Sequence, residues 1–143
     1  MKNTARLSLE TVDEGLRFGA DVDGHRYVLD SGAGAVAASP MQALLGALGG
    51  CTAMDVISIL RKMRQQVKAY EVLLEGERAE EHPRVFTSIE IVHRVTGVDL
   101  NPAMIARAIE LSEARYCSVH AMLAPAVKMT SRYEIVPAVA ARR

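Results

Sequence analysis

Two cysteines are the side chains in this sequence with the widest choice of chemistry. Cys51 follows a pair of glycines, and Cys117 lies far along the chain of 143 residues. A cysteine within a helix is more often a small buried hydrophobe than a reactive group. As a thiolate, however, a cysteine attacks a peroxide oxygen, and a second thiol within reach converts the resulting sulfenic acid to a disulfide. The pair therefore predicts redox chemistry only if the fold brings the two sulfurs together.

Other catalytic patterns do not occur in the sequence. It has no Gly-x-Ser-x-Gly elbow, no Cys-x-x-Cys and no histidine pair at metal-binding spacing, so we expect no metal and no cofactor. Asp55 lies one helical turn after Cys51 and shares its predicted face. It either orients a cation or a water, or it is a buried acid that is hydrogen-bonded to a neighbouring subunit. The second interpretation is favoured, because a carboxylate beside the sulfur opposes thiolate formation.

The elements that must position these residues follow from the hydrophobic pattern. Alternating segments predict three N-terminal strands, and Ser39-Pro40 predicts the start of a long helix that ends at about Gln66. The chain length and the absence of repeats and linkers predict a single domain over residues 1–143. The expected strands are 4–11, 16–22, 25–29, 69–78, 85–95 and 127–136, the shorter helices are 103–114 and 119–124, and a tail covers 138–143.

Three glycines, Gly46, Gly49 and Gly50, interrupt the long helix just before Cys51. Glycine is unfavourable inside a helix, so the cluster predicts a kink or the close approach of another backbone. An interruption there would expose backbone N–H groups to the Cys51 sulfur. Cys117, at the start of a helix, would gain from the helix dipole. Both effects favour a thiolate.

Charge and composition exclude several classes of partner. Lys plus Arg equals Asp plus Glu at 17 each, so we expect no nucleic-acid partner, which would require a basic surface. The longest nearly uncharged stretch, residues 31–54, holds several glycines and Pro40, so we expect no membrane span. The N-terminal residues have the pattern of neither a signal nor a transit peptide, which predicts a cytoplasmic protein with reduced cysteines.

Three segments resemble the OsmC/Ohr family. The run SPMQALLGALGGCTAMDV, from Ser39 to Val56, resembles the central-helix signature of that family, and YCSV, from Tyr116 to Val119, resembles its second cysteine motif. The run HPRVF at residues 82–86 resembles the YhfA-like branch. The resemblance implies an OsmC-like α+β fold, in which an intertwined homodimer wraps its strands around two long central helices. It also implies a thiol site at the subunit interface.

The same resemblance implies a function. Cys51 corresponds to the peroxidatic cysteine and Cys117 to the resolving cysteine of a thiol-dependent peroxidase. Organic hydroperoxides would be the substrates and an external dithiol the reductant. The alternative is a non-catalytic module that binds a small apolar ligand or senses redox state.

The same resemblance implies which residues bind the substrate. Met41 stands where the better-characterised branches have a Glu, and Gln42 lies beside it. Arg17 and Arg26 are the candidates to replace the Arg with which those branches hold the thiolate, a role that rests on lowering the thiol pKa. We therefore expect Arg17, Met41 and Gln42 to bind substrate.

Overall fold

The fold is taken from a computed structural model that describes residues 1–139, so the last four positions of the predicted tail lie outside the described residues. Contacts within the chain group it into two compact units, Met1–Gly46 and Ala47–Arg143. The order of helices and strands confirms the α+β prediction, whereas a single domain over residues 1–143 stays a prediction. The elements are β1 (Ala5–Leu9), β2 (Phe18–Val22), β3 (His25–Leu29), α1 (Pro40–Lys62), β4 (Gln66–Arg78), β5 (Phe86–Val98), α2 (Pro102–Leu111), the π-helical turn η1 (Ser112–Tyr116), α3 (Ser118–Leu123) and β6 (Lys128–Pro137).

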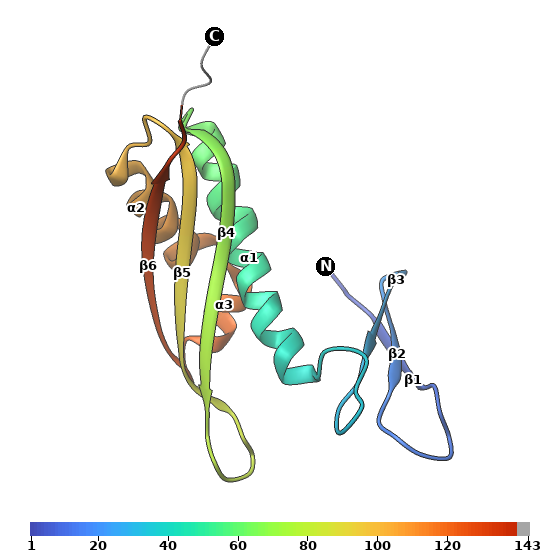
Figure 1. Cartoon of the computed structure of the whole chain (residues 1–143). Coiled ribbons are helices and arrows are strands. Elements are labelled where there is room, and N and C mark those ends of the chain that lie inside the picture. The colour runs from blue at the N-terminus through green and yellow to red at the C-terminus, as the bar shows by residue number, and fades with distance from the viewer. Residues whose placement is uncertain (140–143) are drawn as a thin grey trace. The chain divides into compact units, whose positions relative to one another are not determined.

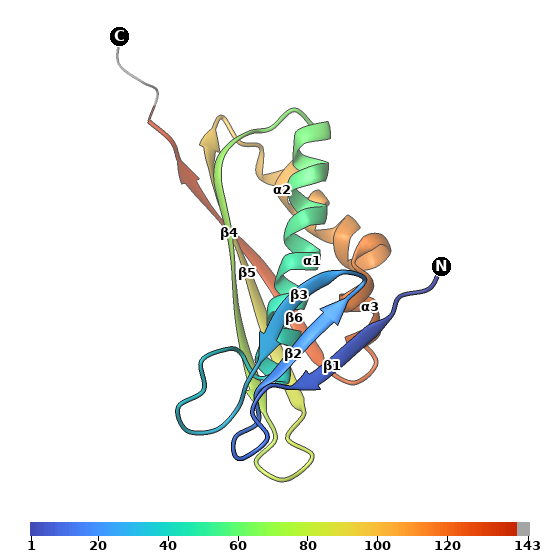
Figure 2. The same ribbon diagram turned by 90° about the vertical axis from the view of Figure 1, so that its right-hand side faces the viewer.

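The first unit is an antiparallel meander in the order β1-β2-β3 (Figure 2). Its second hairpin turns at Asp23 and Gly24, whose positive φ angles of 51° and 84° are those that a tight two-residue turn requires. The three predicted strands are confirmed. The buried residues of this unit are Ala20 and Asp30, so the meander has very little core of its own.

Helix α1 begins at a capping box. The Gln42 backbone N–H donates to the Ser39 hydroxyl over 3.2 Å, and the Ser39 N–H donates back to the Gln42 side-chain carbonyl over 2.9 Å. Pro40 occupies the first helical position, where its missing N–H costs nothing. The predicted start of the helix is confirmed.

The same helix ends at Lys62, before the predicted end at Gln66. Arg64 takes a left-handed conformation with φ 57°, and its N–H donates to the Arg61 carbonyl. The next N–H, of Gln65, donates to the Leu60 carbonyl, which completes a Schellman motif. The predicted end was wrong because a non-glycine residue supplies the left-handed position.

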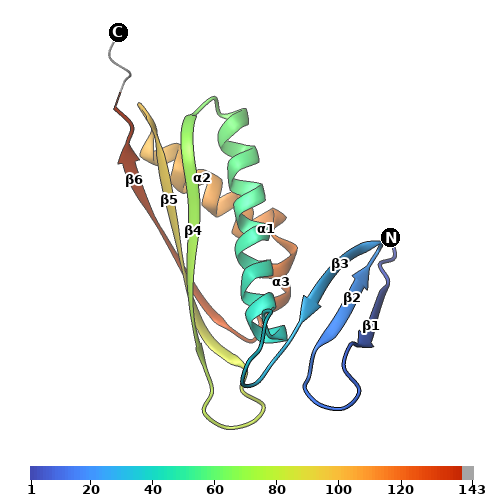
Figure 3. The same cartoon turned by 45° about the vertical axis from the view of Figure 1, so that its right-hand side comes forward.

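The second unit is a three-stranded sheet in the order β4-β5-β6, with β4 antiparallel and β6 parallel to the central β5. Helices α1 and α2 cover the same face of this sheet (Figures 1 and 3). Helix α1 is also long and apolar enough, by length and composition alone, to cross a bilayer, a test that core helices of soluble proteins pass as well. The buried core between helices and sheet consists of Val56, Leu60, Val95, Ile105, Ala108 and Ile109.

Gly49 brings α1 and β4 close together. A Cβ atom placed on Gly49 would lie 2.7 Å from Leu74 Cδ1, which is closer than carbon atoms pack. The close approach is made by a side chain, whereas the glycines predicted the approach of another backbone. The predicted interruption of the helix was wrong, since α1 continues through all three glycines to Lys62.

Helix α2 is capped by the Asn101 side chain, which accepts the Ala103 N–H over 3.0 Å. It ends earlier than predicted because the chain widens into the π-helical turn η1, closed by the Cys117 N–H donating to the Ser112 carbonyl over 2.8 Å. Such turns are rare and frequently occur at functional sites. This one places Cys117 at the N-cap of α3.

Candidate functional site

The fold brings the two cysteines together. The Sγ atoms of Cys51 and Cys117 and a carboxylate oxygen of Asp55 all lie within 4.8 Å of one another. Cys51 and Asp55 come from α1, whereas Cys117 comes from the junction between η1 and α3. All three lie in the second unit. The proximity that disulfide chemistry requires is therefore present, although the sulfurs are not bonded.

The two thiols differ in accessibility. Cys51 is half-buried, whereas Cys117 is only 2% exposed. A reagent from solution therefore reaches Cys51 first. Cys117 is positioned to react with Cys51 rather than with solvent.

The surroundings of Cys51 favour its thiolate. Burial alone disfavours the charged form, but hydrogen bonds from the Val119 backbone N–H, the Cys117 thiol and the Ser118 hydroxyl together outweigh burial and lower the pKa of the Cys51 thiol. The Ser118 Oγ lies 4.0 Å from the sulfur. The negative charge of Asp55 opposes this effect and raises the pKa of the Cys51 thiol. The predicted N–H donor exists, but it comes from α3 and not from an interruption of α1.

Cys117 behaves in the opposite way. Burial raises the pKa of its thiol, and so does the hydrogen bond that the thiol donates to the Cys51 sulfur. The backbone N–H of His120 donates to the Cys117 sulfur over 3.4 Å but does not compensate. The expectation that the helix start would favour a thiolate at Cys117 was therefore wrong. Of the two thiols, Cys51 is therefore the more readily deprotonated.

Asp55 ends a buried chain of hydroxyl groups. The Ser112 hydroxyl donates to Asp55 Oδ2 over 3.0 Å, and the Thr52 hydroxyl lies 3.2 Å from the Ser112 Oγ. Because Ser112 has one hydroxyl hydrogen, Thr52 must donate to Ser112. Thr52 and Ser112 are fully buried. The partner of Asp55 is thus a residue of the same chain, and its bond to a neighbouring subunit stays a prediction.

Arg17 is engaged within the first unit. Its Nε lies 3.2 Å from Asp30 Oδ2, and Asp30 is buried. The backbone N–H groups of Val36 and Ser31, helped by Arg17, hold the pKa of Asp30 below its ordinary value. Arg17 thus has a structural partner already, and its contact with substrate stays a prediction.

Met41 and Gln42 lie in the first turn of α1. The Gln42 side-chain carbonyl accepts the Ser39 N–H, so this residue has a capping role. Met41 is half-buried. Both belong to the first unit, and their role in substrate binding stays a prediction.

Several residues of the site were not found from the sequence. Ser118 and Val119 lie inside the second cysteine motif, so their proximity to Cys117 was visible, but their donation to Cys51 was not. Ser112 gave a weaker signal, since it is a buried serine at the end of an apolar stripe. Only the contact between η1 and α1 shows that Ser112 donates to Asp55.

Known proteins are similar to this chain in sequence and in fold. Residues 32–132, which include both cysteines, match the family model for the OsmC-like protein. The chain is 51% identical over 126 residues to Protein YhfA of Escherichia coli K12, covering 87% of this chain and 94% of that protein.

Solved structures share the fold of this chain. A hypothetical protein from Aquifex aeolicus VF5 is 27% identical with a TM-score of 0.85, covering 97% of this chain and 99% of that one. The organic hydroperoxide resistance protein OhrB of Bacillus subtilis shares the fold, with a TM-score of 0.62 at 12% identity over 94% of this chain and 98% of that one. The chain therefore belongs to the OsmC-like protein family.

Proposed function

We propose that this protein is a thiol-dependent peroxidase that reduces organic hydroperoxides through Cys51 and Cys117. The observation that carries the proposal is the asymmetry of the pair. The accessible thiol has the lowered pKa, and the buried thiol, with the raised pKa, lies within 4.8 Å of it. A peroxidatic cysteine needs access and a thiolate, whereas a resolving cysteine needs proximity.

In the first step the Cys51 thiolate attacks one peroxide oxygen. The O–O bond breaks, the alkoxide takes a proton and leaves as the alcohol, and the sulfur keeps a hydroxyl group as sulfenic acid. The sulfur is thereby oxidised by two electrons, and the peroxide is reduced by two.

In the second step the Cys117 sulfur attacks the Cys51 sulfur. The S–S bond forms and the S–O bond breaks, and the leaving hydroxide takes the Cys117 proton to become water. The sulfurs must close from within 4.8 Å to a bond length of about 2.05 Å. An external dithiol then exchanges with the disulfide and restores both thiols.

The substrate class rests on family membership. OhrB of Bacillus subtilis, which shares the fold, is an organic hydroperoxide resistance protein. We extend that substrate class to this chain because the paired thiols supply the chemistry it requires. We also propose that the protein acts in the cytoplasm, where dithiol reductants are available.

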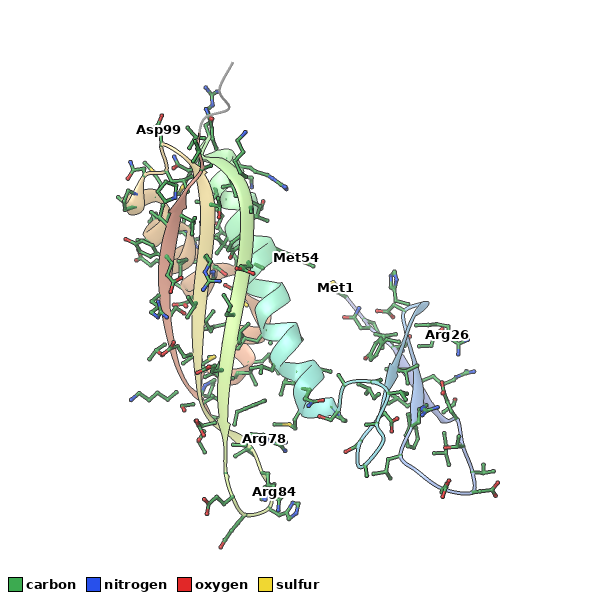
Figure 4. The ribbon with its side chains drawn as sticks, viewed as in Figure 1. Met1, Arg26, Met54, Arg78, Arg84 and Asp99 are labelled. Atoms are coloured by element: carbon green, nitrogen blue, oxygen red, sulfur yellow. The ribbon has the colours of Figure 1, made fainter. Side chains whose placement is uncertain are left out.

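The active form that we propose is a homodimer. Helix α1 has a mean hydropathy of 1.8 over its most apolar 18 residues, yet only 28% of that window is buried. Met54 is 73% exposed and projects from α1 away from the β4-β5-β6 sheet (Figure 4). A second copy of the chain would cover this apolar surface, as the two central helices of the family fold imply.

Stopped-flow mixing of the reduced protein with cumene hydroperoxide tests the function. We expect one peroxide to consume two thiols per subunit, with a dithiol restoring turnover. Cys51→Ser should abolish peroxide consumption, and Cys117→Ser should consume peroxide without forming a disulfide inside the subunit. Ser58→Ala, an exposed change two turns further along α1, is the control and should match the wild type. Turnover in Cys51→Ser equal to that of the wild type would contradict the proposal.

A further inference from the structure

The three ligand atoms of the thiol site have the spacing of a metal centre. The sulfurs of Cys51 and Cys117 and an oxygen of Asp55 lie within 4.8 Å of one another. Two thiolates on a tetrahedral zinc ion, at Zn–S distances of about 2.3 Å, are about 3.8 Å apart. Side-chain adjustments of about 1 Å therefore suffice to bring all three groups onto one ion.

The carboxylate is held in place from behind. Asp55 Oδ2 accepts the Ser112 hydroxyl over 3.0 Å, and Ser112 in turn accepts from Thr52. Thr52 and Ser112 are both fully buried, so this series of hydrogen-bonded hydroxyls is part of the protein core. Metal-binding carboxylates are characteristically oriented by hydrogen bonds of this kind. The hydrogen bond from Ser112 thus fixes the position of the carboxylate.

The charge balance favours a cation. Asp55 takes part in none of the ion pairs among residues 1–139. Binding of a divalent cation releases the protons of both thiols. The ion then supplies the counter-charge for two thiolates and one carboxylate that lie together.

We propose that the reduced pair of Cys51 and Cys117, together with Asp55, binds a thiophilic divalent cation of the zinc class. Two sulfur ligands select zinc or cadmium over magnesium and calcium, which prefer oxygen. The fourth coordination position is open to water, because the half-buried Cys51 lets solvent reach the site. The sequence pattern did not predict this site, since its ligands come from separate elements and follow no local spacing.

The bound cation and peroxide exclude each other. An ion that holds both sulfurs removes the free thiolate that attacks a peroxide, and a disulfide between the sulfurs removes both thiolate ligands. The site therefore holds metal only when the pair is reduced. This consequence rests on the proposed function, but the metal binding itself does not.

Anaerobic titration of the full-length reduced protein with Cd²⁺ tests the proposal, because cadmium-thiolate bonds absorb in the near ultraviolet. We expect saturation at one ion per subunit, with the absorbance of two thiolates, and displacement of Cd²⁺ by Zn²⁺. Cys51→Ser and Cys117→Ser should each remove half of that absorbance or more. The control Ser58→Ala should bind like the wild type.

Asp55→Asn separates a carboxylate ligand from simple binding by thiols. Losing the carboxylate should weaken Cd²⁺ binding at least about tenfold, and Ser112→Ala should weaken it about tenfold through the loss of orientation. Circular dichroism of each variant reports whether it is folded. Absence of a saturable cadmium band in the wild type overturns the proposal, and so does unchanged affinity in a folded Asp55→Asn protein.

The two proposals fail independently. Peroxide consumption is measured on metal-free protein, and cadmium binding is measured without peroxide. A protein that consumes peroxide but gives no cadmium band contradicts the metal site alone, whereas a protein that binds one Cd²⁺ with inert thiols contradicts the peroxidase alone.

Discussion

Cys51 and Cys117 are the same kind of side chain, yet hydrogen bonds act on their sulfurs in different directions. Cys51 accepts from two groups at the start of α3 and from Cys117, so its negative charge is solvated by the protein. The Cys117 thiol donates a hydrogen bond to the Cys51 sulfur and is the more buried of the two. At the scale of single residues, the proposed division of work between attacking and resolving thiol thus rests on hydrogen-bond donors and burial.

Ser118→Ala removes one of the donors to the Cys51 sulfur. Because the hydrogen bond stabilises the thiolate, its loss should raise the pKa of Cys51. The rate of iodoacetamide alkylation measured against pH reports the midpoint. Ser58→Ala, on the exposed side of α1, should leave that midpoint unchanged. An unchanged or lowered midpoint in Ser118→Ala would show that the hydroxyl does not act on the sulfur.

His93 makes a second residue-scale prediction. It is fully buried on β5, with the Tyr70 hydroxyl 2.7 Å from its Nδ1, and its Nε2 has no partner among residues 1–139. Burial lowers the pKa of His93 to about 4. Between about pH 6.5 and pH 4 the unfolded chain binds a proton at this position and the folded chain does not, so stability falls as the pH drops through that window.

The size of this effect is on the order of 3 kcal/mol across the whole window, from a shift of about 2.5 units. Urea denaturation at pH 7 and pH 5 should show about 2 kcal/mol of it, because pH 5 lies within the window. His93→Gln should flatten the dependence, and the exposed His25→Gln should preserve it. NMR titration of the wild type should find His93 neutral at pH 6, and a protonated His93 at that pH would refute the prediction.

At the scale of elements, the sequence predicted those helix and strand boundaries that are set by residues close to one another in the chain. Ser39 and Pro40 marked the start of α1 because a cap and an N1 proline act within one turn. The end of α1 at Lys62, followed by the left-handed Arg64, and the π-helical turn after Leu111 were missed. Both depend on backbone hydrogen bonds, which many residue types can make. No characteristic residue, such as a glycine, therefore marks either position in the sequence.

Gly49→Ala tests the contact between α1 and β4. The added Cβ would lie 2.7 Å from Leu74 Cδ1, so the Leu74 side chain must move and stability should fall by about 1–3 kcal/mol. Gly50→Ala meets nothing within 4 Å and should be neutral or stabilise the protein by up to about 1 kcal/mol. Thermal unfolding of both variants decides the point. Equal effects at the two positions would mean that the contact does not restrict Gly49.

At the scale of the whole molecule, the predicted fold was confirmed because its evidence is spread over the chain, from the N-terminal meander to the last strand. The candidate site was predictable only in part. The cysteine pair came from a family resemblance, whereas Ser112 and Val119 join it through packing between elements distant in sequence. Side-chain contacts between distant elements leave no periodic pattern in the sequence, so the spacing of residues does not predict them.

The apolar exposed surface of α1 predicts a dimer. Light scattering after size exclusion should give twice the subunit mass of 15.5 kDa at micromolar concentration. Met54→Arg places a charge on the exposed apolar side of α1 and should shift the protein toward the monomer. A wild type that stays monomeric up to high concentration would refute the dimer without bearing on the thiol chemistry.

The most direct test of the central claim is intact-mass and peptide mass spectrometry of the reduced protein after one equivalent of cumene hydroperoxide. The account predicts the loss of two hydrogen atoms per subunit and a Cys51–Cys117 cross-linked peptide, formed faster than any overoxidised cysteine. Both thiols recovered unmodified, or oxidation confined to Cys117, would contradict it.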